Sequence, residues 1–289
     1  MRLKYSGAGR STINRNNRRS RIPQDKWVRS MGLDTDGTLF VDMANGIRLY
    51  DVCLNHSIPE AVSIRAEDLM KAENRSLYFR FHSALNEISE LMLDALYDRD
   101  RPFKDGEVVV DAGARIGVFA AKISAAVGER GKVIAIEPEP KNYACLLKNI
   151  RANRLHNVVP VRKMLWSERR RLNLYLSAYP AAHSAYRDPF FASTGTALSV
   201  EADSLDTLLE YLGIDRVNFI KMDIEGAEAE ALKGMKRTLE SDVQMAIAAY
   251  HPVEGHPSLE DMVSRLAALG FQTTSADGIV RARRQPQRY

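Results

Sequence analysis

The 289-residue sequence has only two cysteines and no apolar run near the ~20 residues that a membrane-spanning helix requires. Cys53 and Cys145 are too few for a disulfide framework, and their spacing is not that of a metal site. The basic N-terminus lacks the apolar core of a secretory signal. These absences argue against a disulfide-rich secreted protein and a helical membrane protein, and we expect a cytoplasmic protein.

Charge is ordinary in amount but unevenly placed. The formal net charge is +4, yet residues 1–30 carry nine Lys/Arg against the single acid Asp25. The last nine residues add Arg281, Arg283, Arg284 and Arg288. Residues 1–22 contain almost no large apolar side chain, which favours a disordered, solvated tail. The alternative is a basic arm that binds nucleic acid or an acidic membrane surface.

Residues 31–103 have a mixed pattern. Two apolar-rich runs flank Asn45-Gly46 and predict a hairpin, and residues 83–98 have helical spacing of apolar side chains. We therefore expect three parts, namely a basic tail (1–30), a small N-terminal α+β extension (31–103) and a main domain (104–289).

The main domain alternates between strand-like and helix-like patterns. The predicted strands are Val108–Asp111, Lys132–Glu137, Val158–Leu165, Val217–Asp223 and Gln244–Tyr250. The predicted helices between and after them are Val118–Val127, Pro138–Asn153, Gly226–Leu239 and Ser258–Leu269. Phe271–Ser275 and Ile279–Arg283 flank Asp277-Gly278 and predict a closing hairpin. The expected fold class is α/β: a Rossmann-like, doubly wound, mostly parallel seven-stranded sheet with an antiparallel C-terminal hairpin.

This alternation is interrupted once. Leu172–Leu176 has the pattern of an extra strand, and Ser204–Leu212 that of a short helix. Between them, residues 177–197 show no period and include His183, so we predict a long loop. Loops of this length are often functional.

The segment Val108–Gly117 is the first candidate for a ligand site. A buried strand ends in a turn that contains Gly113 and Gly117, and a helix follows. Ligands of open α/β sheets bind beyond the carboxyl ends of the strands, where glycines allow close backbone approach and a helix N-terminus offers free N–H groups. A tight turn without a ligand is the alternative.

Two nucleotide cofactors fit such a site, a nicotinamide dinucleotide and S-adenosylmethionine. Glu137, 20 residues after Gly117, suits the ribose of either. The turn lacks the middle glycine that a pyrophosphate requires, Asp111 can receive a ligand's ammonium group, and a C-terminal hairpin is usual in methyltransferases. S-adenosylmethionine is therefore favoured.

Several motifs in series resemble the FkbM family of S-adenosylmethionine-dependent methyltransferases. They are Asp111-Ala-Gly-Ala-Arg-Ile-Gly117, Ile136-Glu-Pro-Glu-Pro-Lys-Asn-Tyr143, Leu147-Lys-Asn149, Asp203-Ser-Leu-Asp-Thr-Leu208, Phe219-Ile-Lys-Met-Asp-Ile-Glu-Gly-Ala-Glu228 and Leu232-Lys-Gly234. The resemblance covers about Val108–His251. It implies a Rossmann-like fold and O-methylation, often of sugars or secondary metabolites. Arg115 departs from it, because the family usually has Asn there, and the basic N-terminal arm is not explained by it.

The candidate cofactor-binding residues are Asp111, Gly113, Arg115, Gly117, Glu137, Pro138 and Trp166. Arg115 can pair with the methionine carboxylate or point to solvent, and Trp166 can cover the adenine or be an ordinary core residue.

The candidate catalytic residues are Asp223, Glu225, His251 and Lys221, followed by Glu228. The acids can act as base, orient the acceptor or, as Asp223 and Glu225, hold a divalent metal. His251 is the best histidine base candidate. The alternatives are that Glu225 and Glu228 only complement a helix N-terminus, and that Lys221 forms a structural pair with a carboxylate.

The leading hypothesis is a methyltransferase that O-methylates a sugar, glycan or small metabolite. Two others stay open: an RNA methyltransferase whose basic N-terminal arm grips phosphates, and a non-catalytic binding module on the same fold. A dehydrogenase is a more distant fourth. The sequence indicates neither the acceptor nor the oligomeric state.

Overall fold

The computed structural model describes residues 27–36, 38–51, 63–65, 85, 87–93, 95–177, 181–186, 193–251 and 258–284. The predicted basic tail lies outside the described residues, apart from its last four positions. In the part of the chain that is described, no helix is both long and apolar enough to cross a membrane.

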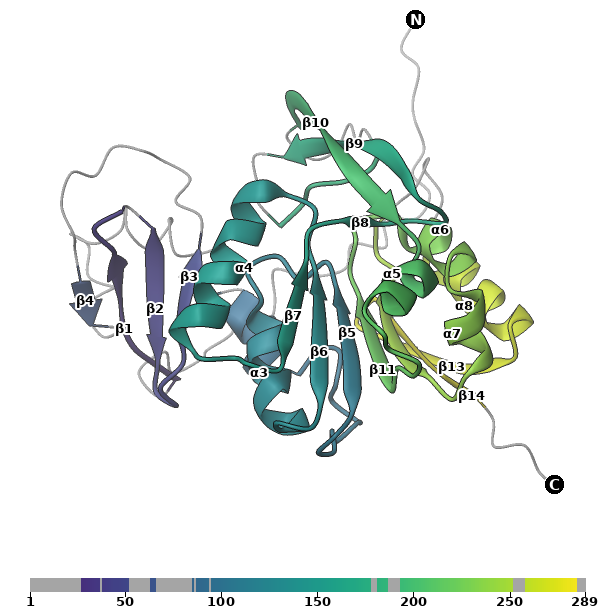
Figure 1. Cartoon of the computed structure of the whole chain (residues 1–289), viewed down its shortest axis with the longest axis horizontal. Coiled ribbons are helices and arrows are strands. Elements are labelled where there is room, and N and C mark those ends of the chain that lie inside the picture. The colour runs from purple at the N-terminus through teal and green to yellow at the C-terminus, as the bar shows by residue number, and fades with distance from the viewer. Residues whose placement is uncertain are drawn as a thin grey trace, which may run out of the picture.

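A seven-stranded sheet forms the centre of the molecule, in the order β13-β14-β12-β11-β5-β6-β7 (Figure 1). Its five parallel strands are β5 (Val108–Ala112), β6 (Lys132–Ile136), β7 (Val158–Val161), β11 (Phe219–Met222) and β12 (Gln244–Ala248). The hairpin of β13 (Phe271–Ala276) and β14 (Ile279–Arg284) closes the sheet, with β14 antiparallel to β12. This confirms the predicted fold class.

Both faces of this sheet are covered because its strands are apolar on both sides. Val109 and Val133 pack into one core with α3 (Val118–Val127) and α4 (Pro140–Ala152). Their neighbours Val110 and Ile134 pack into a second core on the opposite face. That face is covered by α5 (Leu205–Tyr211), α6 (Glu228–Lys233), α7 (Lys236–Glu240) and α8 (Ser258–Ala268). Apolar faces on both sides are the pattern expected of parallel strands between two helical layers.

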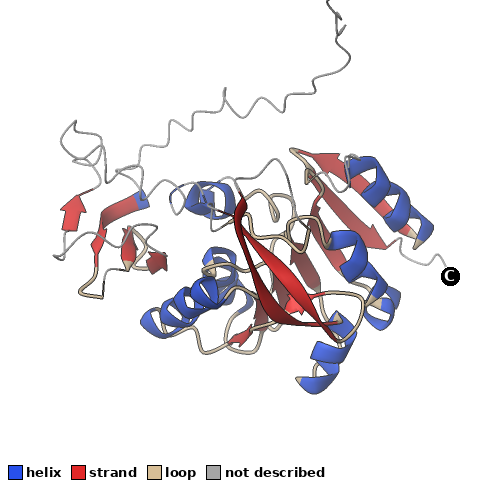
Figure 2. Cartoon of the chain, turned by 90° about the horizontal axis from the view of Figure 1, so that it is seen from above, coloured by secondary structure: helices blue, strands red, loops and turns tan. Residues whose placement is uncertain are grey.

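The N-terminal extension is built on an antiparallel sheet at one end of the molecule, beside α4 (Figures 1 and 2). Its strand order is β3-β2-β1-β4, with β1 (Val28–Leu33), β2 (Leu39–Met43), β3 (Arg48–Asp51) and β4 (Ser63–Arg65). The β2–β3 hairpin confirms the turn predicted at Asn45-Gly46. Asn149 and Asn153 of α4 bond to the backbone of β3 and so attach it to the main domain.

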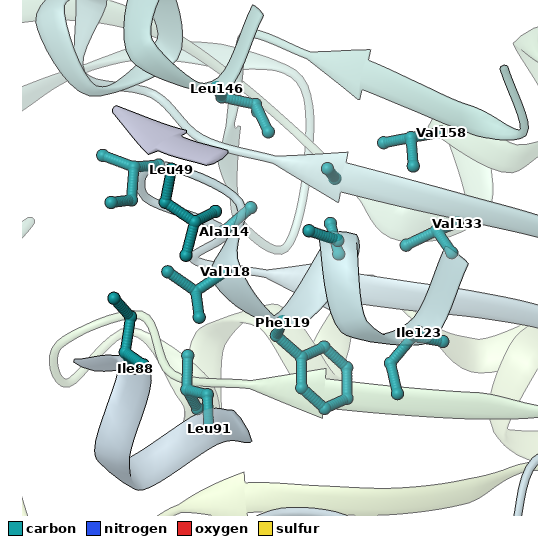
Figure 3. Close-up of a cluster of buried hydrophobic side chains, with 14 of the residues drawn as sticks. Leu49, Ile88, Leu91, Ala114, Val118, Phe119, Ile123, Val133, Leu146 and Val158 are labelled. Carbon is teal, nitrogen blue, oxygen red and sulfur yellow. The ribbon is translucent and has the colours of Figure 1, made fainter. Parts of the chain in front are cut away.

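The extension and the main domain share one apolar core. Leu49 of β3, with Ile88 and Leu91, packs around Val118 and Phe119 of α3 (Figure 3). Ser89–Leu93 forms a short π-helix, where the sequence predicted an ordinary helix over 83–98. Because the same side chains fill both parts, we expect residues 31–103 to fold together with the main domain.

The predicted strand Val158–Leu165 was wrong in its extent. The chain leaves the main sheet after Val161, and β8 (Met164–Leu165) joins a second sheet of order β8-β10-β9. Pro160 has no N–H to donate, which restricts β7 to the edge of the main sheet. The extra strand is confirmed as β9 (Arg170–Ser177), whereas β10 (Ser193–Asp203) begins inside the predicted loop 177–197.

The predicted helix Gly226–Leu239 is broken into α6 and α7 at Gly234. A Cβ on Gly234 would lie 2.5 Å from the carbonyl oxygen of Trp166 and 2.9 Å from that of Ser167. The helix therefore ends where its backbone packs directly on the segment after β8. The predicted helix starting at Pro138 begins at Pro140, because Glu139 is its N-cap and accepts from the backbone N–H of Asn142.

Three of the four arginines near the C-terminus lie in strand β14. Arg281 in β14 donates to the carbonyl of Leu96, and Arg284 donates to that of Leu239 at the end of α7. Arg284 also lies over the ring of Phe271. At least two of the four C-terminal arginines therefore have structural partners, which weakens the case for a nucleic-acid-binding arm there.

Candidate active site

The glycine turn after β5 is fixed by a lysine from the neighbouring strand. Lys221 of β11 is the register partner of Asp111 of β5, and its Nζ lies 3.0 Å from Asp111 Oδ1. The same Nζ donates to the carbonyl of Gly113 at 2.7 Å. Both side chains are buried, at 4% and 0% exposure. This arrangement supports the structural alternative for Lys221, and it places Asp111 inside the strand, already paired.

The turn is also packed against the acidic segment after β11. Gly113 has φ +75°, and a Cβ there would lie 1.8 Å from the carbonyl oxygen of Asp223. A Cβ on Gly117 would meet Leu146 at 2.5 Å. Backbone packing therefore requires glycine at position 113, and the positive φ of +85° favours glycine at position 117, whether or not a ligand also approaches them.

Glu137 lies at the carboxyl end of β6 and faces this turn. Its two carboxylate oxygens each accept one backbone N–H, from Glu139 and from Arg115, both at 2.9 Å. Burial raises the pKa of Glu137 to about 7, although these hydrogen bonds act in the opposite direction. The side chain of Asn142 also bonds to this carboxylate. Because a carboxylate has about four acceptor sites, a position remains for a further donor such as a ribose hydroxyl.

Arg115 does not point to solvent. Its guanidinium pairs with Asp51 of β3, with both Nη2–Oδ distances at 2.8 Å, and with Glu87. Arg115 is 6% exposed and has φ +49°, in the left-handed region. The residue that departs from the family pattern therefore ties the glycine turn to the N-terminal extension.

A cluster of acids and one histidine lies at the carboxyl ends of β11 and β12. His251 Nε2 is 3.0 Å from Glu225 Oε2 and 3.8 Å from Asp223 Oδ1, and its Nδ1 is 3.7 Å from Glu228 Oε1. Tyr97 and Tyr250 donate their hydroxyls to Asp223 Oδ2 at 2.7 and 3.1 Å. The structure thus brings three of the four predicted catalytic residues together, and places the fourth, Lys221, beneath the glycine turn.

The ionisation of this cluster follows from burial and mutual attraction. Burial disfavours the imidazolium, but the carboxylates of Glu225, Glu228 and Asp223 outweigh it and raise the pKa of His251 well above its ordinary value. Burial raises the pKa of Glu225. For Asp223, burial is outweighed by His251, Lys221 and the tyrosine hydroxyls, which lower its pKa. The carboxylates around His251 therefore favour its protonated form in the unliganded protein.

One cavity connects these groups. It is lined by Gly113, Arg115, Glu137 and Pro138 together with Asp223 and Glu225. Residues 181–186 border it through His183 and Ala185, and Ser184 Oγ donates to the carbonyl of Glu225 at 2.6 Å. Its volume is about 60 Å³. Pockets that enclose a small ligand measure ~300–1,000 Å³, so a nucleoside cofactor has to widen it.

Other predicted residues lie farther from this cavity. Trp166 packs against Tyr186, with ring centroids 6.1 Å apart, and against the apolar cluster of the β8-β10-β9 sheet, while its neighbour Leu165 lines the cavity. Glu228 caps the turn after β11 by accepting from the N–H of Ile224.

Four other residues around the site could not be identified from a sequence motif. These are Tyr97, which bonds Asp223, Asp51 and Glu87, which pair with Arg115, and Lys163, which lines the cavity.

The fold and the site together define a class of protein. A mostly parallel seven-stranded sheet that ends in an antiparallel hairpin, with a glycine turn after its first parallel strand and an acid after the next, is the Rossmann-like methyltransferase domain. The family model of the methyltransferase FkbM domain matches residues 111–273, and the chain belongs to this family. The methyl donor of this family is S-adenosylmethionine.

Known relatives are similar over part of their length. Methyltransferase 1 of Beauveria bassiana is 28% identical over 167 residues, which are 50% of this chain and 65% of that protein. The hexuronic acid methyltransferase AglP of Haloferax volcanii is 30% identical over 149 residues, 51% of this chain and 57% of that protein. The chain thus spans less than two thirds of either relative. A solved structure, methyltransferase FkbM from Methylobacillus flagellatus, matches with a TM-score of 0.46 at 24% identity, over 62% of this chain and 44% of that one.

Proposed function

We propose that this protein is an O-methyltransferase that transfers the methyl group of S-adenosylmethionine to a hydroxyl of a sugar, glycan or small metabolite. The observation that carries the proposal is one cavity lined by two unlike groups of residues. Gly113, Glu137 and Pro138 are suited to the cofactor, and Asp223 and Glu225, which contact His251, are suited to the chemistry at the acceptor. Donor and acceptor groups would therefore meet within a single enclosed space.

On the cofactor side, Glu137 accepts a ribose hydroxyl at the acceptor position that its other hydrogen bonds leave open. Lys221 holds the carbonyl of Gly113 and so fixes the shape of the turn. Lys221 and Asp111 act here as positioning residues, since their charges pair with each other beneath the turn. Arg115 fixes the same turn from the side of the extension.

On the acceptor side, the reaction requires a group that removes a proton. The hydroxyl oxygen forms a bond to the methyl carbon, the carbon–sulfur bond breaks, and its electron pair stays on sulfur, leaving neutral S-adenosylhomocysteine. The hydroxyl proton passes to the cluster of Asp223, Glu225 and His251. In this cluster the two carboxylates lie 3.8 and 3.0 Å from the imidazole Nε2. An enclosed site also keeps water away from the sulfonium.

A sugar is the favoured acceptor class for two reasons. One similar protein is named as a hexuronic acid methyltransferase. The cavity wall is also polar enough for a hydroxylated ligand, with Lys163 and His183 beside the acids.

The test begins with binding. Isothermal calorimetry with the full chain should show one S-adenosylmethionine site. Glu137→Gln should weaken binding to this site, whereas Glu129→Gln, at an exposed position in the turn after α3, should leave binding unchanged. Incubation with isotopically labelled donor and a panel of neutral sugars, hexuronic acids and small alcohols should then label an acceptor. Absence of donor binding by the unmutated chain contradicts the proposal. Donor binding without transfer to any sugar, but with transfer to RNA, would replace the acceptor class.

A further inference from the structure

Asp223, Glu225 and His251 are brought together by strand topology. β11 and β12 are parallel neighbours, so the segments that follow them leave the sheet at the same edge. Asp223 comes directly after β11 and His251 three residues after β12. One ligand atom from each of the three residues lies within 4.8 Å of the others.

These spacings are those of ligands around one metal ion. For bond lengths of ~2.1 Å, neighbouring ligands of an octahedral cation lie ~3.0 Å apart and opposite ligands ~4.2 Å apart. The distance from His251 Nε2 to Glu225 Oε2 is 3.0 Å, and that to Asp223 Oδ1 is 3.8 Å. Two of the separations therefore fall within the range that the ligands of a single octahedral cation span.

The hydrogen bonds around Asp223 also favour a cation at this place. Tyr97 and Tyr250 both bond to Asp223 Oδ2, whereas Oδ1 is shielded from solvent and accepts no hydrogen bond from any described residue. Oδ1 is the oxygen that faces His251 Nε2. A buried acceptor without a donor is costly, and a cation would satisfy it.

The other ring nitrogen of the histidine lies near a second carboxylate. His251 is 6% exposed, and while Nε2 faces the two carboxylates, Nδ1 lies 3.7 Å from Glu228 Oε1, just beyond hydrogen-bond distance. Glu228 is itself fixed by the N–H of Ile224. Histidines that bind a metal through one ring nitrogen commonly donate from the other to a carboxylate of this kind, which fixes the orientation of the ring.

We propose that Asp223, Glu225 and His251 bind one divalent cation of the manganese or magnesium type, and that its remaining positions face the cavity and hold the acceptor's hydroxyl oxygen. Two carboxylates with one imidazole favour Mn²⁺ over the all-oxygen preference of Mg²⁺. The catalytic part of this proposal rests on the proposed O-methyltransferase function. The cation would align the oxygen with the methyl group and make its proton easier to remove.

The test uses Mn²⁺ alone, added to the chelator-treated full chain and followed by electron paramagnetic resonance. Binding removes the six-line signal of the free ion, and one site per chain is expected. Asp223→Asn and Glu225→Gln, which keep the shape of each side chain, should each weaken Mn²⁺ binding by about 10- to 100-fold. Glu230→Gln on α6 is the matched control, because it removes one negative charge from a surface pair with Lys233 and should leave the affinity unchanged.

The outcomes separate this proposal from the proposed function. Failure of the unmutated chain to bind Mn²⁺, or equal binding by Asp223→Asn and Glu225→Gln, would overturn the cation site. S-adenosylmethionine binding, measured by calorimetry on the same samples, shows that the variants are folded. Transfer of labelled methyl at an unchanged rate in excess chelator would also exclude the cation while leaving the O-methyltransferase intact. A loss of methyl transfer in chelator that added Mn²⁺ restores supports both the cation site and the proposed O-methyltransferase function.

Discussion

Lys221 and Asp111 form a buried ion pair across two parallel strands, with Nζ 3.0 Å from Oδ1 and neither side chain more than 4% exposed. Their strands are in register at this position, so the pair is built into the sheet itself. Lys221 also donates to the carbonyl of Gly113, in the turn that borders the cavity. The same lysine therefore stabilises the sheet and fixes the shape of this turn.

Lys221→Met should be strongly destabilising, because it leaves the Asp111 carboxylate buried without its counter-charge. Removing one partner of a buried pair costs about 3–5 kcal/mol, and chemical unfolding monitored by circular dichroism would measure it. Lys233→Met, which breaks a more exposed pair with Glu230, should cost about 0–1 kcal/mol. The double variant Lys221→Met/Asp111→Asn should recover part of the loss. Simple addition of the two single effects would show that the charges do not interact.

The parts of the fold that could be predicted from the sequence are those that local apolar patterns determine. The parallel strands could be predicted because each is a short apolar run buried on both faces, as in Val109 and Val110. Asp223 and His251 could be placed at one site because both follow parallel strands. The ends of strands and helices were less predictable: the third strand leaves the main sheet after Val161, and the contact of Gly234 with Trp166 breaks a helix.

The partners of single side chains could not be predicted from spacing. Arg115 meets Asp51 and Glu87, which lie 64 and 28 residues away in the sequence. Tyr97 reaches Asp223 across 126 residues. None of these pairs belongs to a local motif, because the packing of the N-terminal extension on α3 and α4 determines them. This is why Arg115 was an ambiguous departure in the sequence and has a defined role in the structure.

The affinity for S-adenosylmethionine should depend on pH through Glu137. Its pKa is raised to about 7 in the unliganded protein, and the ionised carboxylate is the form that accepts a ribose hydroxyl. Affinity should therefore be constant above pH ~7 and fall by up to about tenfold per unit below it. Calorimetric titrations between pH 5.5 and 8.5, a range of ~1.5 units on either side of that pKa, would show the change.

Glu137→Gln supplies the control for this titration, because an amide cannot ionise. Its weaker binding should show no such step near pH 7. The unliganded protein should also lose stability relative to this variant as the pH rises from about 4.5 to about 7, because the folded state keeps a proton that the unfolded state has released. A step of equal size in Glu137→Gln would assign the titration to another group.

Arg115→Met should loosen the N-terminal extension. It removes the buried ion pair with Asp51, whose side chain is 3% exposed, and it also removes the contact with Glu87. We expect a loss of about 3–5 kcal/mol in unfolding and faster hydrogen exchange in β3. Arg130→Met, which breaks an exposed pair with Asp105, should change stability by less than about 1 kcal/mol. Unchanged exchange in β3 would mean that the shared apolar core and the bonds of Asn149 and Asn153 hold the extension without Arg115.

Gly113→Ala should damage both stability and cofactor binding, and Gly106→Ala separates the causes. Both glycines have positive φ, +75° and +87°, so alanine pays about 1–2 kcal/mol for the left-handed conformation at either position. A Cβ at Gly106 meets nothing within 4 Å, whereas one at Gly113 would lie 1.8 Å from the carbonyl oxygen of Asp223. Gly113→Ala must therefore move the turn away from Asp223, and it should lower the melting temperature well beyond Gly106→Ala and weaken S-adenosylmethionine binding in calorimetry. If the two variants matched in both measurements, the close contact between the turn and Asp223 would have no energetic importance.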